Sequence, residues 1–280
     1  MSDGILLAQR QHGLGATDAS AVLGLNPWKS PLQVWCDKRG LAEPQPESEA
    51  MRWGKLLEPV IADEYSFRTG FKLTMPEAVY HDTEHDFLLG TPDRLVVGQN
   101  RGVEIKTANA YSASEWGAVG TDQVPQHYLI QCMHYLMLIP RIRVWDLAVL
   151  IGGNDFRIYT IQRDDALIAN LRGRLVAWWQ VHMVNGVEPE AMAIDSDFMV
   201  RRYPSSNGNL IPAPFHAGRH VMDLKLARAE AEAADERCDA AQAALKALIG
   251  EADGIEGEGW RVTWKANKNG TRVFRLTEGK

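Results

Sequence analysis

The sequence predicts an α/β protein with a mixed central sheet flanked by helices, followed by a C-terminal helix and a β-hairpin. Between residues 14 and 185, stretches with helical spacing of apolar residues alternate with short runs that have strand patterns. A segment rich in Pro, Ser, Asn and Gly then precedes a helix rich in Ala, Glu, Lys and Leu and a strand-turn-strand pattern. We therefore expect a core, an extended linker or crossing segment, and a long helix with a basic hairpin over residues 1–188, 189–216 and 217–280, respectively.

Two short helices are expected near the N-terminus, between residues 14 and 40. Thr17 or Asp18 is a suitable N-cap for the first helix, because both side chains can accept a hydrogen bond from a free backbone N–H. Ser30 followed by a proline begins the second helix, and Gly40 ends it.

A long amphipathic helix is expected over residues 49–69, ended by Gly70 and kinked by Pro59. Helical spacing predicts an apolar face made of Trp53, Leu56, Leu57, Val60, Ile61 and Tyr65. Short strands follow as far as Lys106, so this helix should pack against the sheet that they begin.

The second half of the core repeats the alternation of helix and strand. Helical spacing returns at residues 124–139 and again at residues 165–185. Between them lie two β-rich runs, residues 143–151 and 157–162, joined by a Gly-Gly-Asn sequence that is typical of a turn. These runs should form neighbouring strands of the sheet.

The stretch GTPDRLVVGQNRGVEIKTA, residues 90–108, is predicted to form a β-hairpin whose polar residues carry the chemistry. Asp93 begins the first strand, and Glu104 and Lys106 share one face of the second because side chains alternate along a strand. Across adjacent strands, the two carboxylates can bind a hard divalent cation such as Mg²⁺. Lys106 could then orient or help deprotonate a water that attacks a phosphodiester. An ion pair on a solvated face is the alternative.

The composition is that of a soluble globular protein. The chain has 280 residues, of which 45% are hydrophobic and 24% charged, so it is long enough to bury a core. No apolar run approaches the ~18 residues of a membrane span, and the N-terminus lacks the features of a signal peptide, so we expect a location in the bacterial host cytoplasm. Cys36, Cys132 and Cys238 are far apart, which disfavours a disulfide framework or a zinc site.

The charge distribution leaves room for a nucleic-acid partner, although the formal net charge is −6. Residues 255–280 hold six Lys or Arg against three Glu, a local charge of +3, and a localised basic surface is enough to hold DNA. Strand alternation predicts that Arg261 and Lys265 lie opposite an apolar face of this hairpin. An accessory grip on DNA, a solubilising face and a subunit contact all remain open for it.

Several ordered motifs lie within roughly residues 8–185: RQHGLGATDASAVLGLNPW, RWGKLLEPVIADEY, GTPD, VEIKT and VPQHYLIQCMHYLM. Together they resemble the phage lambda exonuclease and YqaJ-type viral recombinase family of the PD-(D/E)xK nuclease superfamily. The resemblance implies a restriction-endonuclease-like core. It also implies that Asp93, Glu104, Glu58 and the backbone carbonyl of Ile105 bind metal.

The resemblance implies further site residues outside the hairpin. Gln131 matches an active-site glutamine that helps to hold the attacked phosphate or water. Arg10 and Thr17 match an Arg and a Ser/Thr that recognise a DNA 5′-phosphate, and Lys29 is a weaker candidate for the same pocket. A helix N-terminus beside an Arg guanidinium is physically suited to an anion.

The implied activity is a Mg²⁺-dependent 5′-to-3′ exonuclease acting on double-stranded DNA, with two metal ions per site and Mn²⁺ able to substitute. Such an enzyme degrades one strand and leaves a 3′ overhang for a single-strand annealing protein in phage recombination. The resemblance also implies a homotrimer acting on DNA ends.

Two other functions fit parts of the sequence. A structure- or site-specific endonuclease could use the same core, but a 5′-phosphate pocket serves only an enzyme that begins at ends. A catalytically silent DNA-binding protein would not need Asp93, Glu104 and Lys106 together. An iron-sulfur nuclease on this core would need four clustered cysteines, whereas this chain has three scattered ones.

Overall fold

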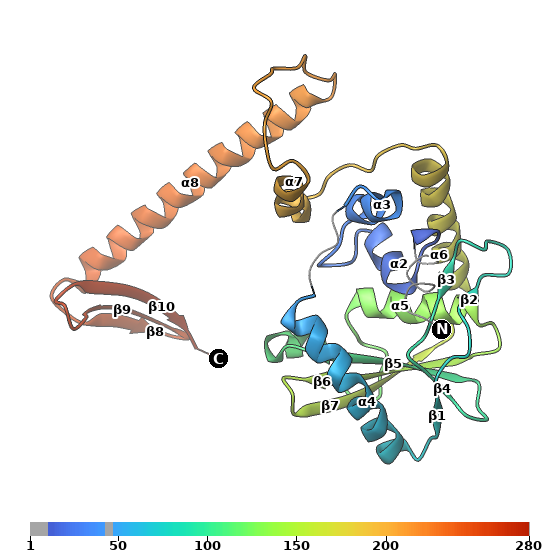
Figure 1. Ribbon diagram of the computed structural model, residues 1–280. Coiled ribbons are helices and arrows are strands. Elements are labelled where there is room, and N and C mark those ends of the chain that lie inside the picture. The colour runs from blue at the N-terminus through green and yellow to red at the C-terminus, as the bar shows by residue number, and fades with distance from the viewer. Residues whose placement is uncertain (1–10, 43–46, 280) are drawn as a thin grey trace. The chain divides into compact units, whose positions relative to one another are not determined.

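The computed structural model describes residues 11–42 and 47–279 of the chain. The chain divides into two compact units, Met1–Ser205 and Ser206–Lys280 (Figure 1). Among the helices of the described ranges, none is both long and apolar enough to cross a membrane.

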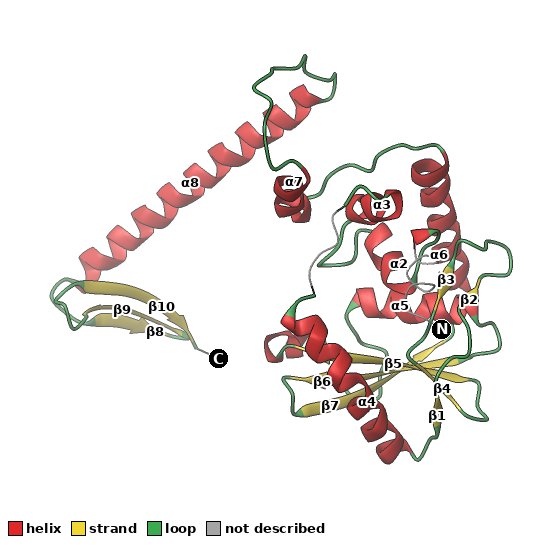
Figure 2. Cartoon of the chain, viewed as in Figure 1, coloured by secondary structure: helices red, strands yellow, loops and turns green. Residues whose placement is uncertain are grey.

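The first unit is built on a five-stranded mixed sheet, which confirms the predicted fold class (Figure 2). Its strand order is β1-β4-β5-β6-β7, and the central pair β5 and β6 is parallel while the other neighbours are antiparallel. The strands are β1 (Leu73–Thr74), β4 (Arg94–Val96), β5 (Arg101–Ala108), β6 (Val144–Ile151) and β7 (Asp155–Gln162). A separate two-stranded sheet pairs β2 (Tyr80–His81) with β3 (Leu89–Gly90).

Helices cover both faces of this sheet (Figure 2). One face packs against α4 (Glu49–Thr69), and the other is covered by α5 (Gln126–Leu138). On α5 pack α2 (Ala16–Val22) and α6 (Asp165–Trp178), and α3 (Pro31–Arg39) packs on α2. Alternation along β5 sends Val103 and Ile105 towards α4, while Glu104 contacts Gln131 of α5. The predicted polar face of the hairpin is therefore the face that α5 covers.

Helix α4 has the predicted bounds, but its apolar face is narrower than predicted. Ile61 and Tyr65 are buried against the sheet, together with Ala62. Trp53 and Val60 were expected on the same face and are instead 52% and 57% exposed, as Leu56 is at 51%. A helix on a sheet buries only the stripe that meets the strands, so apolar residues beside that stripe stay in solvent.

The two N-terminal helices are confirmed, but the predicted cap of the first is wrong. The N-cap of α2 is Gly15, and Asp18 at the third helical position accepts a hydrogen bond from the Gly15 N–H (3.1 Å). Thr17 is exposed in the first turn. Ser30 caps α3 as predicted, and Gly40 ends it in the left-handed conformation with φ of 67°.

A glycine in β5 lets a tryptophan pack flat against the sheet. A Cβ atom at Gly102 would lie 2.5 Å from the Trp145 ring, which is fully buried and stacks on Tyr135 with centroids 5.0 Å apart. Because no side chain could occupy that space, the close approach of β5 and β6 at this point requires glycine.

The segment predicted as an extended linker contains helix. It includes a 3-10 turn, η3 (Ala193–Asp195), and a short helix, α7 (Ser196–Arg202), both in the first unit. Asp195 is 1% exposed and accepts hydrogen bonds from the Ser30 hydroxyl (2.5 Å) and the Gln33 amide (2.8 Å). These bonds to α3 and the burial of Phe198 hold the segment in place, a long-range effect that composition does not reveal.

The second unit consists of one long helix and an antiparallel sheet. The helix is α8 (Ala217–Ile249), and the sheet has the order β10-β9-β8. The predicted hairpin is confirmed as β9 (Trp260–Ala266) and β10 (Arg272–Glu278), and β8 (Gly254–Gly257) is a strand that sequence reasoning missed.

The basic residues of this sheet are mostly engaged within the unit. Arg272 lies over the Trp264 ring at 3.8 Å and donates to the carbonyls of Trp264 and Gly250. Arg261 pairs with Glu256 at 2.8 Å, and Lys265 lies 3.4 Å from Asp253. Arg272 is therefore a structural residue rather than part of a free basic face.

Candidate active site

The hairpin of β4 and β5 brings the two predicted carboxylates together. The antiparallel register pairs Arg94 with Val103, and continuing it by one residue places Asp93 opposite Glu104. The Ile105 N–H donates a hydrogen bond of 2.8 Å to Asp93 Oδ2, which fixes this carboxylate beside β5. The structure thus confirms that the two acids meet across adjacent strands.

Glu104 is the most deeply buried acid of the cluster, with 1% of its surface exposed. Its Oε1 accepts hydrogen bonds from Lys106 Nζ at 2.6 Å and from the Gln131 side-chain amide. Its Oε2 is buried and has no hydrogen-bond partner among the described residues. Burial, followed by the charge of Asp93, raises the pKa of Glu104 to about 8, although Lys106 acts in the opposite direction.

The pKa of Asp93 is also raised. Burial raises its pKa above the usual range, and Glu58 adds to this effect, while Lys106 and the Ile105 N–H oppose it. Both neighbouring carboxylates are costly to ionise even with Lys106 beside them, so a further positive charge would stabilise the site.

Lys106 is held as a cation. Burial by itself would lower the pKa of its ammonium, but Glu104 and Asp93 outweigh burial and raise the pKa above the usual range. The ammonium also lies 5.6 Å from the centre of the Tyr128 ring. A lysine with a raised pKa is a poor proton acceptor, so the geometry favours an orienting and charge-stabilising role over that of a general base.

Gln131 lies on the buried face of α5, and its amide points to Glu104 rather than into open space. The contact fixes one oxygen of Glu104 and leaves the other available. The predicted role at the attacked phosphate or water stays a prediction, and the structure adds the positioning of Glu104.

Glu58 lies near enough to raise the pKa of both Asp93 and Glu104, but its carboxylate is engaged by an arginine. Its Oε1 accepts a hydrogen bond of 2.8 Å from Arg94 Nη1, so a cation of the protein already fills the role expected of a metal. Within residues 11–42 and 47–279, no group of three His, Cys, Asp or Glu side chains is arranged to hold a metal ion. The third carboxylate ligand stays a prediction, and in this arrangement of side chains Arg94 binds it.

The remaining donors nevertheless fit a hard divalent cation. Glu104 presents a buried oxygen without a partner among the described residues, and Asp93 lies beside it with a carboxylate that burial disfavours. Such a cation prefers carboxylate oxygens and would lower the pKa of both groups by its charge. The predicted carbonyl ligand of Ile105 belongs to the same strand as Glu104.

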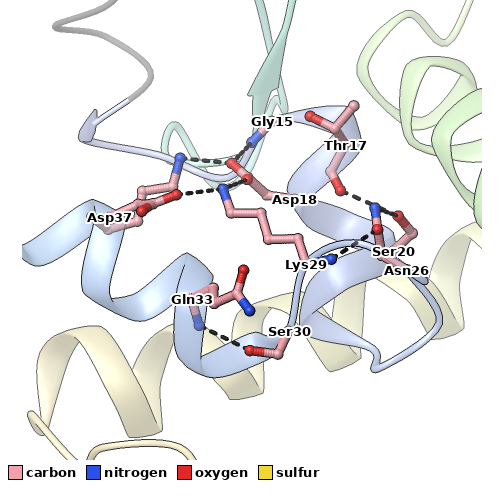
Figure 3. A network of polar contacts seen from close by, with 10 residues as sticks. Gly15, Thr17, Asp18, Ser20, Asn26, Lys29, Ser30, Gln33 and Asp37 are labelled. Atoms are coloured by element: carbon pink, nitrogen blue, oxygen red, sulfur yellow. Dashed lines mark hydrogen bonds and ion pairs between the residues drawn. The ribbon is translucent and has the colours of Figure 1, made fainter. Parts of the chain in front are cut away.

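Two acids, Asp18 and Asp37, lie beside the residues of the predicted 5′-phosphate site that the structure describes (Figure 3). Lys29 Nζ lies 2.6 Å from Asp37 and 3.3 Å from Asp18, so its charge is engaged by two carboxylates. Asp18 also pairs with Lys38 at 2.6 Å. Lys29 was expected to contact a phosphate. In this structure it links α2 and α3 through its ion pairs with Asp18 and Asp37.

Thr17 and Arg10 stay candidates for binding the 5′-phosphate. Thr17 is exposed at the start of α2, and its carbonyl accepts a hydrogen bond from the Ser20 hydroxyl at 3.2 Å. Arg10 lies outside the described residues.

Three residues near the site were missed by sequence reasoning. Arg94 follows Asp93 directly, and its position in the GTPDR stretch was the available signal. His127 has a buried Nε2 without a partner among the described residues, and burial lowers its pKa to about 4. Trp28 is 65% exposed and makes an edge contact with the His127 ring, with centroids 4.9 Å apart.

Residues 6–138 match the family model of the YqaJ-like viral recombinase domain, which confirms the resemblance found in the motifs. The chain is 36% identical over 207 residues to the uncharacterized protein YqaJ of Bacillus subtilis (strain 168), covering 72% of this chain and 64% of YqaJ. It is 28% identical over 137 residues to the uncharacterized protein R354 of Acanthamoeba polyphaga mimivirus, covering 45% of this chain and 24% of R354. The chain thus spans less than two thirds of either relative.

Solved structures share the fold. The alkaline exonuclease LHK-Exo from Laribacter hongkongensis superposes with a TM-score of 0.54 at 20% identity, covering 65% of this chain and 93% of that protein. The complex of LHK-Exo with dAMP gives a TM-score of 0.53 at 18% identity, covering 72% of this chain and 97% of that protein. These similarities show that the sheet and its helices have the exonuclease fold.

Proposed function

We propose that this chain, whose residues 6–138 match the YqaJ-like viral recombinase domain, is a Mg²⁺-dependent exonuclease that degrades one strand of double-stranded DNA from its 5′ end. The observation that carries the proposal is the cluster of Asp93, Glu104 and Lys106 on the hairpin of β4 and β5, in which Glu104 Oε2 is buried without a partner among the described residues. The likeness in fold to an alkaline exonuclease supports the same reaction class.

Each residue of the cluster has a distinct task in phosphodiester hydrolysis. Asp93, Glu104 and the carbonyl of Ile105 would hold two Mg²⁺ ions, for which Mn²⁺ would substitute. The ions supply neutralisation of charge on the scissile phosphate and lower the pKa of water. Lys106, held as a cation, stabilises negative charge that develops on the phosphate. Gln131 keeps Glu104 in one orientation through its amide. Glu58 would join the metal ligands only by leaving Arg94.

The polarity of digestion rests on the N-terminal segment. Arg10 and the exposed Thr17 would bind the 5′-phosphate, with Lys29 able to contribute only if it leaves Asp18 and Asp37. The product would be a 3′ overhang for a single-strand annealing protein in phage recombination. By the same resemblance, the enzyme would work as a homotrimer on DNA ends in the cytoplasm of the bacterial host.

Digestion of linear duplexes that differ only in their 5′ ends tests this proposal. With Mg²⁺, we expect nucleotides to be released from the 5′-phosphorylated duplex, faster than from the 5′-hydroxyl duplex, with the complementary strand left intact. The Asp93→Ala variant should release none, and a covalently closed circular duplex should stay uncut.

Each other function predicts a different result from these substrates. Cutting of the closed circle would favour the endonuclease. Binding of duplex without any Mg²⁺-dependent product would favour the catalytically silent DNA-binding protein. Loss of the 3′-ended strand instead of the 5′-ended strand would overturn the proposed polarity.

A further inference from the structure

Helix α8 carries a heptad pattern of apolar residues along its central part. The helix has 33 residues and stands out as one continuous element of the second unit (Figure 1). Apolar side chains recur at alternating intervals of three and four residues, and we call this set the seam: Leu224, Ala227, Ala231, Ala234, Cys238 and Ala241. This spacing places all six on one stripe of a helix.

The unit's own sheet does not cover the seam. It packs only on the C-terminal turns of α8, where Ile249 is buried and Lys246 Nζ lies 5.6 Å from the centre of the Phe274 ring. Upstream of these turns Leu224 is 52% exposed and Cys238 is exposed. A stripe with a strict period of 3.5 residues over about two and a half heptads is the pattern of a helix that packs along a second helix.

Charged residues flank the seam on both sides and show which helix can pair with it. Arg228 and Asp235 follow seam positions, whereas Glu230 and Arg237 precede seam positions. None of these four makes an ion pair within residues 11–42 and 47–279 of its own chain. Each side of the seam therefore carries one acidic and one basic residue that could form ion pairs with a second helix.

We propose that α8 associates with α8 of a second copy of this chain as an antiparallel, two-fold symmetric coiled coil. In the register centred between Ala231 and Ala234, Leu224 faces Ala241 of the partner subunit and Ala227 faces Cys238 of the partner subunit. The small side chains let the two helix axes approach towards the lower end of the usual range of about 8–10 Å.

The same register satisfies the flanking charges. In an antiparallel coiled coil, residues that precede the seam face their counterparts on the partner, as do residues that follow it. Glu230 then lies opposite Arg237 of the partner subunit, and Arg228 lies opposite Asp235 of the partner subunit. Because the two-fold axis repeats each pair, four pairs of oppositely charged side chains flank the interface.

A parallel arrangement would satisfy only Arg228, which would face Asp223 of the partner subunit. There, a residue before the seam meets the residue that follows the seam five positions later on the partner. Glu230 would then face Asp235, two like charges, and Arg237 would face the uncharged Gln242. Charge complementarity thus selects the antiparallel pair.

Sedimentation equilibrium of the full chain tests whether the seam associates. The Ala231→Glu/Ala234→Glu variant places charges in the seam, and Ala229→Glu/Ala233→Glu is the matched control on the solvent side of the same turns. Glu is a good helix former, so circular dichroism should show equal helix content for both variants. At equal protein concentration, we expect the wild type and the control to have twice the mass of the seam variant. If the first units form a trimer, three α8 pairs would join two trimers into six chains, again twice the mass of the trimeric seam variant. Equal masses would overturn the proposal.

Charge exchange tests the register. Glu230→Arg and Arg237→Glu should each weaken association, because each places like charges opposite one another twice. The double exchange should restore it. In a parallel pair Glu230→Arg would instead strengthen association, because the introduced arginine would face Asp235, and that outcome would overturn the antiparallel register.

Cys238 reports the direction of the helices without any substitution. In the proposed register, Cys238 faces Ala227 of the partner subunit, so the two Cys238 residues lie eleven positions, or about 16 Å, apart along the axis. A disulfide cannot form over that distance, and mild oxidation should give no cross-link. In a Cys238→Ser background, Leu224→Cys/Ala241→Cys should cross-link two chains. Rapid cross-linking through native Cys238 would contradict the proposal.

Discussion

Glu104 is the most deeply buried acid of the proposed active site. Lys106 and Gln131 fix one of its oxygens, and the other has no partner among the described residues. A group that costs free energy while unpaired is retained when a ligand uses it. The side chains around Glu104 should therefore matter for hydrolysis more than for DNA binding, since most binding energy comes from phosphate contacts elsewhere.

Substitutions at the hairpin should separate cleavage from binding. We expect Asp93→Ala to abolish Mg²⁺-dependent hydrolysis, and Lys106→Ala to slow it by about 10²- to 10³-fold, the usual cost of removing one charge-stabilising donor. Duplex affinity should stay within about twofold of the wild type, because neither side chain supplies the bulk of the phosphate contacts. Asp63→Ala and Lys72→Ala, both at exposed positions, serve as matched controls. Robust hydrolysis by purified Asp93→Ala would remove Asp93 from the site.

His134 should make the first unit sensitive to acid. Its ring is fully buried and bonded to the Leu89 carbonyl, and burial lowers its pKa to about 4. The ordinary pKa of about 6.5 applies in the unfolded chain. A lowered folded pKa means that stability is fully present above pH 6.5 and is lost as the pH falls towards 4, here by up to about 3 kcal/mol. His134→Gln should remove this part of the pH dependence, and Gln can still donate to the Leu89 carbonyl.

Chemical denaturation of both proteins from pH 4 to pH 8 measures this effect. The difference in unfolding free energy between the wild type and His134→Gln should be constant above pH 7 and shift towards the variant below pH 6.5. Parallel curves over the whole range would show that His134 does not carry the proton.

At the scale of elements, the contact of β5 with β6 decides where the site hairpin lies. Gly102→Ala should destabilise the first unit by about 1–3 kcal/mol, because the added Cβ would meet the Trp145 ring at 2.5 Å in a packed core. Gly173→Ala in α6 is the matched control. A Cβ there meets no atom within 4 Å, so we expect a gain of about 1 kcal/mol from helix propensity.

Thermal unfolding distinguishes the two glycine variants by sign. The melting temperature should fall for Gly102→Ala and rise for Gly173→Ala. A neutral Gly102→Ala would mean that the Trp145 ring moves without cost, and the hairpin would then be less constrained than its packing indicates.

At the scale of the whole molecule, the chain divides into two units, and all the proposed site residues of the hairpin and α5 lie in the first. Asp93, Glu104, Lys106 and Gln131 all lie in the unit Met1–Ser205. A chain ending at residue 205 should therefore fold and hydrolyse short duplexes with Mg²⁺ at a rate within a few fold of the full chain. Loss of hydrolysis in a folded truncated protein would show that the second unit completes the site.

In the sheet of the second unit, phosphate contacts with DNA would come from the basic side chains that have no partner within the unit. Because Arg272, Arg261 and Lys265 already have partners, Lys268 and Arg275 are the residues to test. Removing one phosphate contact should flatten the slope of log affinity against log salt by roughly one unit. We expect Lys268→Gln/Arg275→Gln to flatten it by one to two such units, and Arg261→Gln to leave it unchanged. An unchanged slope for the double variant would eliminate the grip.

Local chemistry was enough to predict most of the elements and the hairpin of β4 and β5. Ser30 and Gly40 define α3, Gly70 ends α4, and alternation along β5 puts Glu104 and Lys106 on one face. These signals depend on the residue and its nearest neighbours in the chain, so the sequence contains them in full. The motifs that resemble the recombinase family extend the same information to the carboxylates proposed to bind metal.

Only the tertiary structure decided which partner each charged side chain takes. Arg94 binds Glu58, Asp18 and Asp37 engage Lys29, and Asp195 anchors a segment whose composition predicts a linker. A charged group takes the partner that compensates its loss of water, and that partner can lie anywhere in the chain. Local pattern therefore identifies which residues carry charge, whereas the folded packing determines whether that charge is neutralised by a neighbour or left for a ligand, as at Glu104.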